Sequence, residues 1–144
     1  LTRPYSLIRR GAMVSFETKI RVEYHHTDQM GIVHHSNYVK FFEVARTEWL
    51  RAMGITYAEM ERRGVMMPIV DVAVKYRNPA LYDELISVTA FVDEAPMARM
   101  TFRYEVRGED GREIATGSTT LGFIDSQTRR PQRAPQWLLE VIKF

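Results

Sequence analysis

The fold of this chain is decided by residues 37–53, which read N-Y-V-K-F-F-E-V-A-R-T-E-W-L-R-A-M. Apolar side chains recur here at helical spacing while polar ones fill the opposite face, as in an amphipathic helix. The apolar positions are Tyr38, Phe42, Ala45, Trp49 and Met53. Ser36 or Asn37 can cap the start, and Gly54 suits the position just past the end. The segment therefore predicts a long helix with one bulky face to bury.

On either side of this helix, the apolar spacing changes from helical to alternating. Residues 16–25 alternate between apolar and charged side chains, which predicts a half-buried strand. A short second helix is expected around residues 56–63. Strand-like segments follow at residues 66–77, 84–95, 98–107 and 112–125, and residues 134–143 look like a closing helix. An antiparallel sheet with one apolar face would bury the long helix by wrapping it, so the pattern predicts an α+β domain.

The composition excludes several classes of protein. The sequence has no cysteine, so neither a disulfide nor a thiolate metal site can form, which is compatible with a reducing cytoplasm. No stretch approaches the roughly 20 consecutive apolar residues that a membrane span needs. We therefore expect a cytoplasmic protein without stable membrane insertion.

The small positive charge of the chain belongs to its first residues. The sequence has 20 Lys and Arg against 18 Asp and Glu, a balance of +2. Residues 1–12 contain three arginines and no acid, so the rest has 17 basic and 18 acidic residues. A nucleic-acid binder would keep its basic excess on the folded part, so no such partner is expected. We expect residues 1–12 to be a flexible N-terminal extension or a cloning remnant, and residues 13–144 to form a single domain.

All four histidines of the chain fall in one short stretch between the first strand and the long helix. They are His25, His26, His34 and His35. A metal site is the first hypothesis for such a cluster. Neighbours in an extended strand point to opposite faces, so adjacent histidines at a strand end cannot easily chelate one ion together. On this reasoning we expect no metal.

Asp28 lies in the same stretch, shortly before the start of the long helix. The free N–H groups of a helix start carry positive potential and could polarise a thioester or ester carbonyl. Asp28 could then attack that carbonyl or draw a proton from water. Gly31 would let the loop turn back toward the helix. Asp is also a common turn residue in T-D-x-x-G, so on the residues alone the turn and the catalytic role both stay open.

The run Y-x-x-T-D-x-x-G-I-V-H-H-S-N-Y-x-x-F-F-E-x-A-R over residues 24–46 resembles the signature of the 4-hydroxybenzoyl-CoA thioesterase family. The similarity is to the branch typified by the Tol-Pal-associated acyl-CoA thioesterases. A second landmark, Y-R-N-P-A-L-Y-D-E-L, follows at residues 76–85, and the resemblance covers about residues 16–135. It implies a hot-dog fold, in which a five-stranded antiparallel sheet wraps around a long central helix. It also implies a homodimer joined through the sheet edges, often paired into a homotetramer.

The resemblance assigns expected roles to residues of this loop. Asp28 matches the catalytic aspartate, as nucleophile or general base, and His35 and Tyr24 match the residues that accompany it. We expect His35 to hydrogen-bond the thioester or the attacking water, and Tyr24 to support the loop through its hydroxyl. Backbone N–H groups near Ser36–Tyr38 would hold the thioester oxygen. The expected substrate-binding residues are Gly31, Ser36, Asn37 and Tyr38.

The implied reaction is hydrolysis of an acyl-CoA to a carboxylic acid and free CoA, with no separate cofactor because CoA is part of the substrate. The alternative is a non-catalytic acyl-CoA-binding or scaffold protein of the same fold. Pocket lining departs from the family at Gln29-Met30 and at His25-His26, which makes the acyl group hard to infer. We expect Glu43 to pair with Arg46 on the long helix rather than act in catalysis. Candidates for the CoA phosphates are Lys75, Arg77, Arg99 and Arg103.

Overall fold

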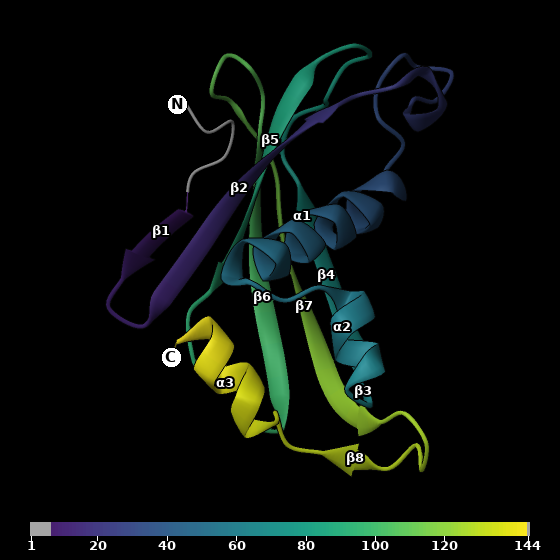
Figure 1. The fold of residues 1–144 in the computed structure, drawn as a ribbon. Helices are drawn as coiled ribbons and strands as arrows, with labels where there is room; N and C mark the ends of the chain where they lie inside the picture. Colours follow the sequence, from purple (N-terminus) through teal and green to yellow (C-terminus); the bar gives the residue numbers. More distant parts are fainter. Residues whose placement is uncertain (1–6, 144) are drawn as a thin grey trace.

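The computed structural model describes residues 7–143, which form one antiparallel sheet with a long helix across one of its faces (Figure 1). The strands are β1 (Leu7–Arg10), β2 (Met13–Arg21), β3 (Val65–Met66), β4 (Ile69–Tyr76), β5 (Leu85–Val92), β6 (Arg99–Arg107), β7 (Glu113–Asp125) and β8 (Pro131–Gln132). The helices are the 3₁₀ turn η1 (Tyr24–His26), then α1 (Asn37–Met53), α2 (Tyr57–Arg62) and α3 (Gln136–Ile142). The predicted α+β class is confirmed.

The strands follow the order β1-β2-β5-β6-β7-β3, and β4 and β8 also pair with β7. The five predicted strands correspond to the five long ones, but the count of five is too low because the structure adds β1, β3 and β8. Both β3 and β8 have two residues and pair with the end of β7, so neither has a period that a sequence pattern could show. The strand β1 lies within the predicted N-terminal extension and pairs with β2, whereas residues 1–6 lie outside the described residues.

The core lies between α1 and the inner face of the sheet. Phe42 of α1 stacks on Tyr104 with ring centroids 4.2 Å apart, and Trp49 meets Phe102 edge to face at 5.3 Å. The indole nitrogen of Trp49 also donates to the carbonyl oxygen of Val14 at 3.1 Å. These aromatic contacts fix both the depth and the rotation of α1 against the sheet.

Gly117 of β7 lets α1 approach this closely. A Cβ atom built at this position would lie 2.5 Å from the ring of Phe42 and 2.6 Å from the carbonyl oxygen of Ala73. Both distances are far shorter than a van der Waals contact, and the neighbouring backbone cannot move away easily. The helix and the sheet therefore meet over a residue without a side chain.

The loop between β2 and α1 lies at one end of the sheet, and α3 lies toward the other (Figure 1). Within residues 7–143, no helix is long and apolar enough to cross a membrane.

Candidate active site

The loop before α1 is a compact hairpin around Asp28. The N–H of Asp28 donates to the carbonyl oxygen of Ile32 at 2.9 Å, and the N–H of Gly31 donates back to the carbonyl oxygen of Asp28 at 3.0 Å. Gly31 has a φ of 79°, a left-handed conformation that glycine adopts without strain. The loop is attached to the rest of the domain through Val33, whose N–H donates to the carbonyl oxygen of Ala80 at 2.9 Å. The tight turn therefore holds Asp28 in one place.

Asp28 is half-buried, and only one of its two carboxylate oxygens is used by the loop. Oδ1 accepts the N–H of Met30 at 2.8 Å, the hydrogen bond of an Asp in a turn. Among residues 7–143, no donor lies within hydrogen-bond distance of Oδ2. Asp28 can therefore stabilise the turn through Oδ1 and still have Oδ2 available for chemistry.

The N–H groups at the helix start differ in whether they have an acceptor. Those expected to bind the substrate oxygen are already engaged: Ser36 with His34 Nδ1 at 3.2 Å, Asn37 with the His34 carbonyl at 3.0 Å, and Tyr38 with the His35 carbonyl at 3.4 Å. The N–H of His35, one residue earlier, has no acceptor within the described part of the chain. The N–H group that is available to a substrate oxygen is therefore that of His35, not one of those expected at Ser36–Tyr38.

Asp28 and His35 line the same pocket, which has a volume of about 350 Å³. The other lining residues come from the same loop, from Tyr38 and from the end of β4; they are Met30, Ile32, Val33, Tyr76, Arg77, Asn78 and Pro79. Burial raises the pKa of Tyr38 to about 12, so its phenol stays neutral at physiological pH and forms an aromatic wall. Two residues that line this pocket thus carry a free carboxylate oxygen and a free N–H, and apolar side chains form much of the remaining lining.

Tyr76 is a pocket residue that the sequence pattern missed. Its hydroxyl donates to the carbonyl oxygen of His35 at 3.0 Å, and its ring meets that of Tyr38 edge to face at 5.3 Å. The peptide plane beside the free N–H is thus anchored from β4, 41 residues along the chain. Tyr76 begins the landmark at residues 76–85, but no local signal in the sequence marks its contact with His35.

Four other predicted site residues lie outside this pocket. Tyr24 is 80% exposed and packs against Tyr82 at 5.8 Å, and its carbonyl, not its hydroxyl, holds the turn by accepting from Thr27. Gly31 shapes the turn without lining the pocket. The Ser36 hydroxyl bonds His34 Nδ1, and Asn37 donates to the His26 carbonyl at 2.8 Å, so neither side chain caps α1. These residues support the loop rather than face its cavity.

Glu43 lies on the exposed side of α1, with its carboxylate 3.8 Å from Arg46. Arg46 is buried and donates to the hydroxyl of Tyr57 at 3.1 Å. This agrees with the structural role expected for both residues, and neither lines the pocket of Asp28.

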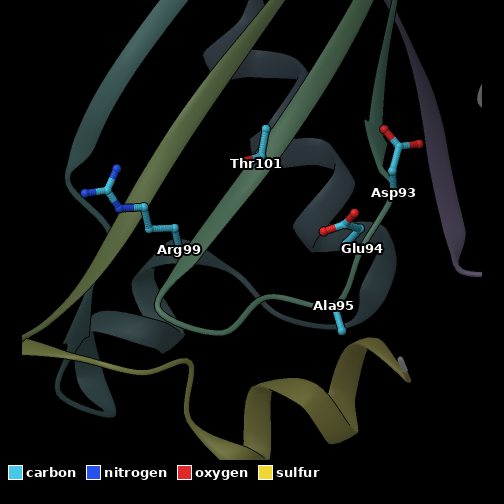
Figure 2. Close-up of a pocket in the computed structure, with 5 residues that line it drawn as sticks. All are labelled: Asp93, Glu94, Ala95, Arg99 and Thr101. Carbon is cyan, nitrogen blue, oxygen red and sulfur yellow. The ribbon is translucent and has the colours of Figure 1, made fainter.

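The four candidate cations for a phosphate differ in their surroundings. Lys75 is exposed on β4 and does not line the pocket of Asp28. Arg77 lines the pocket of Asp28 and has only a 3.9 Å contact with Glu113. Arg103 is held by Asp93 at 3.1 Å and by Glu105 at 3.2 Å. Arg99 borders a different pocket of about 310 Å³ at the β5–β6 turn, across from Asp93 and Glu94 (Figure 2). That second pocket contains two acids and no residue of the 24–38 loop, so it suits neither the thioester nor a phosphate.

The chain matches known proteins over most of its length. Residues 22–142 match the family model described as the thioesterase-like superfamily. The chain is 35% identical over 122 residues to the acyl-CoA thioesterase YbgC of Haemophilus influenzae, covering 84% of this chain and 89% of that protein.

Two solved structures are similar over the same extent. The DHNA-CoA thioesterase of Staphylococcus aureus aligns with a TM-score of 0.81 at 35% identity, covering 88% of this chain and 87% of that one. A hypothetical protein of Thermus thermophilus aligns with a TM-score of 0.82 at 35% identity, covering 88% and 96%. Both matches cover most of this chain and most of the solved structure.

Proposed function

The chain belongs to the thioesterase-like superfamily and has its hot-dog fold, and on that basis we propose that it hydrolyses the thioester of an acyl-CoA to a carboxylic acid and free CoA. One observation carries the proposal: the free Oδ2 of Asp28 and the free N–H of His35 belong to residues that line one pocket. The names of the relatives support the substrate class.

The chemistry needs only these two groups and water. The thioester oxygen accepts the His35 N–H, which lies at the positive end of α1 and stabilises the negative charge that develops on attack. Asp28 Oδ2 either attacks the carbonyl carbon itself or takes a proton from the water that attacks, and both routes give a tetrahedral intermediate. The C–S bond of that intermediate then breaks and the electron pair leaves with the CoA sulfur. After attack by water this step gives the carboxylic acid directly, whereas after attack by Asp28 it gives an anhydride that a water molecule then hydrolyses. A thiol has a pKa near 8.5, so the thiolate departs without a strong acid.

The remaining pocket residues position the substrate. The imidazole of His35 is exposed at the pocket and hydrogen-bonds the substrate or the attacking water. Met30, Ile32, Val33 and Pro79 offer apolar surface to the acyl group, and Arg77 lies where the polar arm of CoA would leave. Within the family, the signature at residues 24–46 supports the branch typified by the Tol-Pal-associated acyl-CoA thioesterases. The absence of cysteine supports a cytoplasmic location.

Tyr76→Phe is expected to lower kcat about tenfold with little change in KM. The substitution removes only the hydroxyl that holds the His35 carbonyl, so the neighbouring N–H loses its fixed direction while the aromatic wall remains. Steady-state thiol release measures both constants. Tyr82→Phe is the matched control, because Tyr82 is exposed and its hydroxyl contacts no described residue. If both variants behave like the wild type, Tyr76 has no positioning role.

We propose that the active form contains a homodimer joined through β4. Within residues 7–143, this strand pairs with β7 alone, which leaves its other edge unpaired. It exposes four large apolar side chains, those of Ile69, Val70, Val72 and Tyr76, and an unpaired apolar edge of this kind usually meets another strand. Pairing of two β4 strands about a twofold axis would cover these side chains in both copies. Because Tyr76 also lines the pocket, the partner would border the site.

Val72→Asp is expected to convert the dimer to a monomer at micromolar concentration. A charge at the centre of β4 would be buried without a partner in the interface, while in the separated chain it is solvated. Light scattering after size exclusion gives the mass. Ile8→Asp on β1, the other outer strand, is the control and should leave the mass unchanged. A wild-type protein that is already monomeric, or a Val72→Asp variant that stays dimeric, would exclude this interface.

A further inference from the structure

A second cluster of reactive side chains lies just before the catalytic hairpin, in the 3₁₀ turn η1. Adjacent histidines in an extended strand would diverge, which was the reason to expect no metal. The chain instead turns at Tyr24–His26, and the rings of His25 and His26 lie 4.2 Å apart. Glu23 joins them, and one donor atom from each of the three residues lies within 4.8 Å of the other two. The turn at η1 therefore lets these three side chains converge, which an extended strand would prevent.

The three donors have the chemistry and the exposure that a metal ion requires. Imidazole nitrogen and carboxylate oxygen are ligands that Zn²⁺ binds at about 2.0–2.2 Å. Because the three side chains are already this close, small rotations would bring their donor atoms around one ion. The side chains of Glu23 and His25 are 60% and 71% exposed, which leaves room for water to complete the coordination. The chain has no cysteine and the three donors are nitrogen and oxygen atoms, so the site favours ions that accept these ligands.

Neighbouring contacts hold two of the three ligands in place. The Glu23 carboxylate accepts the backbone N–H of His26, and the His26 ring packs edge to face on Phe41 at 5.0 Å. The Glu23 carboxylate also meets His25 Nε2 at 2.6 Å, and His26 Nδ1 accepts the Glu23 N–H at 2.9 Å. An ion would take the place of the proton between His25 and Glu23. Side chains already oriented in this way lose little freedom on binding.

We propose that Glu23, His25 and His26 form a binding site for one divalent transition-metal ion, for which Zn²⁺ is the appropriate probe. The site is separate from the thioester chemistry, since none of its residues lines the pocket of Asp28. It adjoins that pocket through the backbone: the His26 carbonyl accepts the N–H of His34 at 2.8 Å and the side chain of Asn37 at 2.8 Å. An ion at η1 would therefore stiffen the base of the catalytic loop.

Calorimetric titration of untagged, chelator-treated protein with ZnCl₂ tests the site. We expect one ion per chain in the wild type. His25→Asn and Glu23→Gln should each weaken binding at least about tenfold, as loss of a ligand does. His34→Asn is the matched control, because His34 also stacks on a neighbouring histidine, at 4.1 Å, but belongs to the other histidine pair. This control should bind as the wild type does.

Three results would overturn the proposal. They are no saturable binding by the wild type, binding by His25→Asn and Glu23→Gln as tight as that of the wild type, and loss of binding in His34→Asn. Thermal unfolding of each variant checks that the substitutions leave the fold intact. The titration does not depend on turnover, so its outcome is independent of the thioesterase proposal.

Discussion

Asp28→Asn is expected to lower kcat for thioester hydrolysis on the order of 10³-fold, with KM changed little. The amide can still accept the Met30 N–H through its oxygen, so the hairpin keeps its shape. The other carboxylate oxygen is replaced by a nitrogen that can neither attack a carbonyl nor take a proton from water. Loss of a nucleophile or general base removes the chemical step while binding remains.

Thiol release under saturating acyl-CoA measures this effect. Asp83→Asn is the matched control, because Asp83 is exposed and has a φ of 67°, a left-handed conformation that asparagine also tolerates. We expect the control to keep wild-type kcat and both variants to keep the wild-type melting temperature. Equal turnover by Asp28→Asn and the wild type would remove Asp28 from the mechanism.

Gly117→Ala is expected to lower the free energy of unfolding by about 3 kcal/mol, at the upper end of the usual cost of overpacking. The added methyl group would lie 2.5 Å from the ring of Phe42 and 2.6 Å from the Ala73 carbonyl oxygen. Phe42 cannot easily move, because its ring is stacked on that of Tyr104 with centroids 4.2 Å apart. The helix must therefore shift or the strands must separate.

Chemical denaturation measures this cost in Gly117→Ala, in Gly122→Ala and in the double variant Gly117→Ala, Phe42→Leu. Gly122→Ala on the same strand is the control, since its Cβ would meet only Val70 at an ordinary 3.6 Å. We expect the control to change the free energy by less than about 1 kcal/mol. In Gly117→Ala, a smaller side chain at position 42, Phe42→Leu, should recover part of the loss. Equal stability of Gly117→Ala and Gly122→Ala would contradict the packing described for α1.

Local periodicity predicted the regular parts of this fold. The amphipathic pattern gave α1 its bounds, and the alternation in residues 98–107 corresponds to the buried positions Met100, Phe102, Tyr104 and Val106 of β6. These features are local, because the spacing of apolar residues within one segment determines which face of the helix or strand is buried. The strand before the loop was less well predicted. It ends at Arg21 because the chain turns at η1, and a turn of three residues has no period of its own.

The candidate site was predicted in part. The motif identified Asp28 and the helix start, and the structure places Asp28, His35 and Tyr38 around one pocket. The identity of the free N–H could not be predicted, since it depends on which neighbouring carbonyls are within reach. Tyr76 was missed because a contact between distant residues leaves no local signal. The exposure of Tyr24 was missed because the alternating pattern of the strand continues through this residue in the sequence, whereas the strand itself ends at Arg21.

Release of free thiol by the wild-type protein, measured on a panel of acyl-CoAs, tests the central claim most directly. The panel should contain short-chain, long-chain and aromatic acyl groups, with binding of each measured in parallel. We predict multiple-turnover release of thiol and acid in equal amounts from at least one of them. Saturable binding with no thiol release from any acyl-CoA would contradict hydrolysis and identify the chain as a non-catalytic acyl-CoA-binding protein.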